Sequence, residues 1–170
     1  MSNSTKKSIN GATKKSKVVR GNNNGGGLYA AYGSNLSVFQ MSYRCPDAKI
    51  IGTGKIMDYK LVFRLHADIE KHDASYVPVL VWSISKADEK WLDKYEGVKG
   101  GYYHQEKVSV VMDDGKELVA MVYIMNSQDT VSPPDDLYYK IIEDGYEHFG
   151  FDKKILETAL NESIERNKIG

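Results

Sequence analysis

The part of the chain that is expected to fold begins with the stretch Leu28-Tyr29-Ala30-Ala31-Tyr32-Gly33-Ser34-Asn35-Leu36. Its first five residues are apolar and rich in aromatic rings, which predicts a short β-strand. Gly-Ser-Asn then predicts a turn, and the segment up to Pro46 predicts a short helix with Ser34 or Asn35 as its N-cap. A strand, turn and helix in this order present free backbone N–H groups, which can hold an anion. Gly-Ser-Asn is also common in turns without a ligand, so the pattern alone leaves both interpretations open.

The residues before this stretch have a different composition. Residues 1–27 contain six basic residues but no acidic or aromatic residue, and they end in a run of Asn and Gly. Such a segment buries too little apolar surface to offset the entropy lost on ordering, so a disordered basic tail is predicted for residues 1–27. Residues 28–170 form the predicted globular domain, which keeps 17 of the 23 basic residues and all 23 acidic ones.

The composition of the whole chain argues against several classes of protein. The 23 basic and 23 acidic residues cancel, so the strong positive charge of a nucleic-acid-binding domain is absent. The apolar runs are far shorter than the roughly 20 residues that cross a bilayer, and residues 1–27 lack the apolar segment of a secretory signal. Cys45 is the single cysteine, which fits a reducing compartment. We therefore expect a cytoplasmic protein without a membrane or nucleic-acid partner, and a salt-sensitive contact of the basic tail with an acidic partner is a further hypothesis.

Hydrophobic patterning predicts further strands, followed by helices. The predicted strands are 49–54, 59–65, 77–83, 108–112 and 118–125, and residues 67–76 are predicted to be a polar loop. The predicted helices are 85–97, 136–149 and 152–167. Ser85-Lys86-Ala87-Asp88 resembles a capping box at the start of the first of these helices, which stops at Gly97. Asp114-Gly115 predicts a hairpin with a two-residue loop between the last two strands.

The helix that begins at Ser85 places Glu96 at its C-terminal end. The helix dipole does not stabilise a carboxylate there, and partial burial would raise its pKa toward the range of a general acid or base. A solvated surface glutamate fits the same position, so the pattern leaves its role open. The four histidines lack metal-ligand spacing and no phosphate-binding glycine motif occurs, so neither a metal nor a cofactor is expected.

An ordered set of motifs resembles the gamma-glutamylcyclotransferase family. The first motif is the stretch 28–36, and the second is Leu92-Asp93-Lys94-Tyr95-Glu96-Gly97-Val98 followed by Gly101-Tyr102-Tyr103. The further matches are Val81-Trp82, the segment from Tyr123 to Met125, and a Ser-Pro-Pro loop before Tyr138. The resemblance extends from Leu28 to about Ile142.

The resemblance implies both a fold and an activity. The fold is α+β, with a mixed, strongly curved sheet that closes toward a small barrel with flanking helices. The activity releases an amino acid or amine from a gamma-glutamyl compound while the glutamyl part closes into 5-oxoproline. Because the α-amine of the substrate attacks its own γ-carbonyl, the reaction is intramolecular and needs no cofactor. The implied partner is this small-molecule substrate, and a homodimer is compatible with the family.

The resemblance also implies the site residues. Glu96 matches the catalytic glutamate, which moves a proton from the attacking amine to the leaving nitrogen. The substrate-binding residues that it implies are Tyr29, Ala30, Ala31, Tyr32, Gly33, Ser34, Tyr103 and Tyr138. Tyr123 is a further candidate that also fits an ordinary strand position, and Asn35 is expected to cap the helix and brace the loop.

Two alternative functions stay open at this point. Some relatives remove a gamma-glutamyl protecting group during biosynthesis, and the same anion-binding loop also suits a module that binds a glutamyl-like ligand without chemistry. Tyr-Gly-Ser-Asn-Leu differs from the Tyr-Gly-Ser-Leu that glutathione-specific relatives resemble, so glutathione is not the expected main substrate. It also differs from the Tyr-Gly-Thr-Leu of the branch that acts on gamma-glutamylamines.

Overall fold

The computed structural model describes residues 25–127 and 130–169, so residues 1–24 of the predicted tail 1–27 lie outside the described residues. The strands are β1 (Leu28–Ala31), β2 (Lys49–Arg64), β3 (His66–Ser83), β4 (Tyr103–Met112) and β5 (Glu117–Met125). The α-helices are α1 (Val38–Arg44), α2 (Lys86–Tyr95), α3 (Asp136–Phe149) and α4 (Lys153–Asn167), with two 3-10 turns, η1 (Ser34–Leu36) and η2 (Val98–Gly100).

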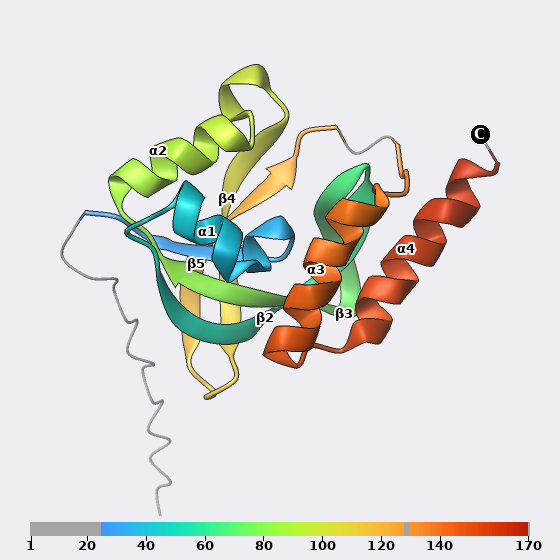
Figure 1. Cartoon of the computed structure of the whole chain (residues 1–170). Coiled ribbons are helices and arrows are strands. Elements are labelled where there is room, and N and C mark those ends of the chain that lie inside the picture. The colour runs from blue at the N-terminus through green and yellow to red at the C-terminus, as the bar shows by residue number, and fades with distance from the viewer. Residues whose placement is uncertain (1–24, 128–129, 170) are drawn as a thin grey trace, which may run out of the picture.

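The strands close into a barrel in the order β1, β3, β2, β4, β5. β1 completes the closure because it pairs on both sides, antiparallel to β3 and parallel to β5, where Tyr29 lies opposite Met121. The other neighbouring strands are antiparallel, so the sheet is mixed. Figure 1 shows α3 and α4 together on one side of the barrel and α2 at its other end. The predicted α+β class, with a small closed barrel and flanking helices, is confirmed.

β2 and β3 form one long hairpin, which corrects two predictions. The separate strands predicted at 49–54 and 59–65 are a single strand with an irregularity at Asp58, where φ is +59°. Residues 67–76 were predicted to be a polar loop, and this prediction is wrong because they belong to β3. Lys71 and Asp73 of this segment are exposed, whereas the buried Asp68 is paired: Nη1 of Arg64 lies 2.8 Å from one of its carboxylate oxygens.

The helical segment after β1 starts later than predicted. Ser34 and Asn35 lie in the turn η1, and α1 begins after Ser37, whose hydroxyl accepts a hydrogen bond from the Gln40 N–H at 3.2 Å. The prediction that Ser34 or Asn35 caps the helix is therefore wrong, because Ser37 supplies an equivalent hydroxyl three residues before Gln40. Ser34 and Asn35 are both buried, and both line the cavity that is described below.

Most of the remaining local predictions are confirmed, although β4 begins at Tyr103 and not at Val108. The Ser85 hydroxyl accepts from the Asp88 N–H at 3.1 Å and the Asp88 carboxylate accepts from the Ser85 N–H at 3.0 Å, which completes the predicted capping box of α2. β4 and β5 pair antiparallel in a hairpin at the predicted position, but its loop is longer than the predicted two residues: the Met112 N–H donates to the Lys116 carbonyl at 2.8 Å, so Asp113, Asp114 and Gly115 all lie in the loop. Within 25–127 and 130–169, no helix combines the length and apolar character needed to cross a membrane.

Candidate active site

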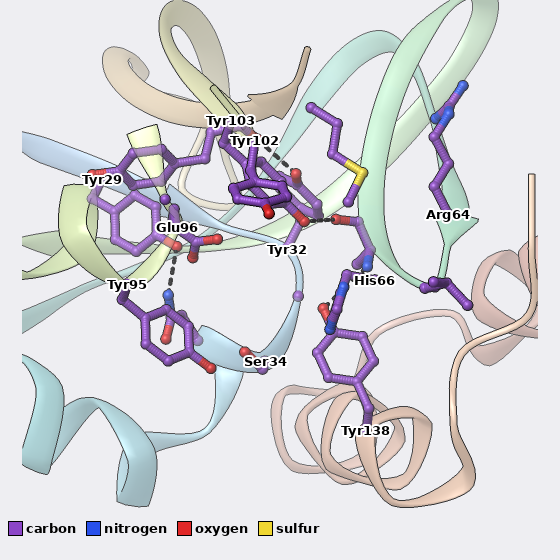
Figure 2. Close-up of a pocket in the computed structure, with 17 residues that line it drawn as sticks. Tyr29, Tyr32, Ser34, Arg64, His66, Tyr95, Glu96, Tyr102, Tyr103 and Tyr138 are labelled. Atoms are coloured by element: carbon purple, nitrogen blue, oxygen red, sulfur yellow. Dashed lines mark hydrogen bonds between the residues drawn. The ribbon is translucent and has the colours of Figure 1, made fainter. Parts of the chain in front are cut away.

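A cavity of about 510 Å³ opens where β1, η1, the β2–β3 tip, the end of α2 and α3 meet (Figure 2). This volume lies within the range of roughly 300–1,000 Å³ that is usual for small-molecule sites. Seven of the twelve tyrosines in the chain line the cavity, namely Tyr29, Tyr32, Tyr95, Tyr102, Tyr103, Tyr123 and Tyr138. The walls are therefore mainly aromatic rings, which come from segments far apart in the sequence.

Glu96 is the one residue with a carboxyl group among the described residues that line the cavity. It follows the last residue of α2, and its N–H donates to the Leu92 carbonyl at 2.8 Å. Gly97, with φ +64°, then turns the chain away from the helix. Burial raises the pKa of Glu96 from 4.5 to about 7, and the positive charge of Arg44 opposes part of this rise. A carboxyl group with this pKa can both accept and return a proton near neutral pH.

Arg44 links the Gly-Ser-Asn loop to the end of α2. Its Nη1 donates to Asn35 Oδ1 at 2.6 Å and to Ser34 Oγ at 3.2 Å. Its Nη2 donates to the Tyr95 hydroxyl at 2.5 Å, and the guanidinium carbon lies 3.8 Å from the centre of the Tyr95 ring. Sequence reasoning missed Arg44, because its partners lie up to 51 residues away in the chain and a basic residue in the last turn of a helix is common.

The loop after β1 is held by hydrogen bonds to buried groups. The Tyr32 hydroxyl donates to the Tyr123 carbonyl at 2.6 Å. Asn35 Nδ2 donates to the Tyr29 hydroxyl at 2.9 Å, and the Asn35 carbonyl accepts from Trp82 Nε1 at 3.2 Å. Asn35 therefore braces the loop, as predicted, although it does not cap α1. The shape of the loop is therefore fixed by hydrogen bonds within the protein itself, which favours a preformed site.

Ala67, at the start of β3, connects three of the predicted site residues. Its N–H donates to the Tyr138 hydroxyl at 3.0 Å, and its carbonyl accepts from the Tyr103 hydroxyl at 3.1 Å. A Cβ added to Gly33 would lie 3.3 Å from the Ala67 Cβ and 3.4 Å from the Tyr138 hydroxyl, so glycine allows this close approach. Ala67 was missed because residues 67–76 were predicted to be a loop.

The structure brings most of the predicted residues to one place. The predicted residues that line the cavity are Glu96, Tyr29, Tyr32, Gly33, Ser34, Tyr103, Tyr138 and the further candidate Tyr123. Ala30 and Ala31 do not line it, because both are completely buried in the core where β1 pairs with β3. The lining residues that were assigned no role in the sequence are Arg64, Leu65, His66, Ala67, Tyr95, Gly97, Tyr102 and Met125.

Comparisons with known proteins found relatives that cover most of the chain. Residues 76–155 match the AIG2-like family. The chain is 34% identical over 152 residues to the gamma-glutamylcyclotransferase of Bos taurus, with 82% of this chain and 79% of that protein covered. It is 31% identical over 153 residues to that of Mus musculus, with 83% and 80% covered. A solved structure of a gamma-glutamyl cyclotransferase superposes with a TM-score of 0.71 at 30% identity, covering 78% of this chain and 85% of that one. The chain therefore belongs to the gamma-glutamylcyclotransferase family.

Proposed function

We propose that the protein releases an amino acid or amine from a gamma-glutamyl compound while the glutamyl part closes into 5-oxoproline. The observation that carries this proposal is Glu96, a carboxyl group with a pKa of about 7 in a cavity walled by tyrosine rings. Relatives that are 31% to 34% identical bear the name gamma-glutamylcyclotransferase, which supports the same chemistry here.

The proposed reaction is an intramolecular acyl transfer. The α-nitrogen of the substrate forms a bond to its own γ-carbonyl carbon, and the bond from that carbon to the departing nitrogen breaks. The Glu96 carboxylate first takes a proton from the α-ammonium group, which makes the nitrogen nucleophilic. The protonated Glu96 then gives this proton to the departing nitrogen. The second proton lost by the attacking nitrogen ends on the released amine, so Glu96 returns to its carboxylate form and no water is consumed.

In this proposal the loop after β1 holds the glutamyl part. The proposal assigns the backbone N–H groups of Gly33 and Ser34 to the substrate carboxylate or to the oxygen that becomes negative during attack. Gly33 and Ser34 line the cavity at this point, and Tyr103 and Tyr138 form part of its wall. Holding the amine and the carbonyl of one molecule together supplies much of the rate in such a reaction.

Proton NMR of gamma-glutamyl-alanine with the full-length protein, in the presence of EDTA, tests the proposal. We expect 5-oxoproline and free alanine to appear in equal amounts. Glu96→Gln removes the group that accepts the proton and keeps nearly the same shape, so product formation should fall by about 10²-fold or more. Turnover at the wild-type rate in a folded Glu96→Gln protein would contradict the role of Glu96. Saturable binding without product, measured by calorimetry, would favour a binding module instead.

A further inference from the structure

Four of the residues that line the cavity are exposed to solvent, and none of them has a permanently charged side chain; we call these four residues the mouth of the cavity. These residues are Leu65, His66, Tyr95 and Tyr102. Leu65 is 61% exposed and Tyr102 is 71% exposed, although both are large apolar side chains. Where exposed apolar side chains surround the opening of a cavity, a bound ligand typically covers them.

The ring of Tyr102 packs against the glycine-containing turn that follows Glu96. A Cβ added to Gly97 would lie 2.8 Å from Cδ2 of Tyr102, and one added to Gly100 would lie 3.3 Å from Cδ2 and Cε2. The turn therefore needs glycine so that the ring can lie against its backbone. Tyr102 lines the cavity together with Glu96 and Tyr103, and Figure 2 shows the three side chains in the same part of the site. Tyr102 is exposed and Glu96 is half-buried, so the ring lies nearer to solvent than the carboxyl group.

The two arginines near the site are already engaged with the protein. Nη1 and Nη2 of Arg64 lie 2.8 Å from Asp68 and 2.7 Å from Glu70, and its guanidinium points away from Glu96 in Figure 2. Arg44 donates to the loop and to the Tyr95 hydroxyl, as described above. A charged departing group would thus find no permanent opposite charge among the four residues of the mouth. An apolar departing group would instead bury the exposed rings of Tyr95 and Tyr102.

From this arrangement, and resting on the proposed function, we infer that the departing nitrogen of the preferred substrate carries an aromatic group. This group lies against Tyr102 and Leu65 at the mouth, while the glutamyl part lies deeper, beside Glu96 and the loop. An aromatic amino acid and an aromatic amine both present this chemistry. The inference deepens the proposed function, because it concerns the half of the substrate that leaves.

Values of kcat/KM for four substrates test the inference. The substrates are gamma-glutamyl-phenylalanine, gamma-glutamyl-phenethylamide, gamma-glutamyl-alanine and gamma-glutamyl-glutamate. The wild-type protein should favour at least one of the two aromatic compounds over the alanine compound by about tenfold, because burial of a ring against another ring is favourable. The glutamate compound should be the poorest substrate. A preference for both aromatic compounds would show that the protein recognises the ring alone. A preference for the phenylalanine compound alone would show that the departing group is an aromatic amino acid and not an aromatic amine.

Variants at the mouth test whether Tyr102 and Leu65 recognise the departing group or contribute equally to the turnover of every substrate. Tyr102→Ala should lower the phenylalanine-to-alanine ratio of kcat/KM by about threefold to tenfold, and Tyr102→Phe should keep it. Phe39→Ala removes a ring of equal exposure, 71%, from α1 outside the cavity lining, so the ratio should not change. Leu65→Asn is a second variant, because φ is +65° there and asparagine adopts that conformation readily. It should also lower the ratio.

Two results would overturn the inference while leaving the proposed function intact. One is wild-type kcat/KM for gamma-glutamyl-alanine that equals or exceeds the values for both aromatic compounds. The other is an unchanged ratio in both Tyr102→Ala and Leu65→Asn, with thermal unfolding that shows both proteins to be folded. The absence of turnover with all four compounds would overturn the proposed function, and this inference with it.

Discussion

Glu96→Gln should make the protein more stable at alkaline pH at the same time as it removes the activity. The folded-state pKa of Glu96 is about 7, above the 4.5 of an unburied glutamate, because burial disfavours the charged form. Between these two values the folded protein holds a proton that the unfolded chain has released. The free energy of unfolding of the wild type therefore falls as pH rises from about 4.5 to about 7, and it stays lower above that range.

The size of this effect follows from the difference between the two pKa values. Each pKa unit corresponds to about 1.36 kcal/mol, so full ionisation of Glu96 costs the folded state about 3 kcal/mol. Glutamine has nearly the same shape as protonated glutamate and does not ionise, so the variant escapes this cost. The two proteins should thus have similar stability near pH 4, and the variant should be more stable by up to about 3 kcal/mol at pH 8.

Urea unfolding between pH 4 and pH 9 measures this difference. Tryptophan fluorescence can follow the transition, because Trp82 is buried in the core. A shift of the midpoint with an unchanged m-value reports a change in stability alone. Glu157→Gln on the exposed side of α4 is the matched control, and its stability should follow that of the wild type at every pH. The reasoning is refuted if Glu96→Gln shows the same pH dependence as the wild type, or is the less stable protein at pH 8.

Three further predictions follow from the same geometry. The value of kcat/KM should fall about tenfold per pH unit well below pH 7, because protonated Glu96 cannot act as a base; stopped assays from pH 5 to 9 with gamma-glutamyl-alanine check this. Arg44→Gln should move that kinetic pKa upward, because the positive charge of Arg44 lowers the pKa of Glu96, and an unmoved profile would argue against the coupling. Gly97→Ala should destabilise the protein by about 1–2 kcal/mol in urea unfolding, because φ is +64° and the new Cβ would lie 2.8 Å from the Tyr102 ring; a change below about 0.5 kcal/mol would show that the turn adapts.

The sequence by itself determined those features that depend on neighbouring residues. The capping box of Ser85 and Asp88, the turn at Asp114-Gly115 and the helix end before Gly97 all formed where they were predicted. Each depends on contacts within about four residues, so a local pattern contains all the necessary information. The same local rules placed Glu96 just beyond the end of a helix, which is where the cavity receives it.

Other features were decided only by the tertiary structure. The polar segment 67–76 continues as β3 because it pairs with β2, and the buried Asp68 within it is paired with Arg64, although the composition of the segment predicted a loop. Arg44 belongs to the site because α1 folds back against η1 and α2, and no short-range pattern records that contact. The pKa of Glu96 likewise depends on how much water the surrounding side chains remove. Desolvation and strand pairing are properties of residues that are distant in sequence, so they exist only once the chain has closed into the barrel.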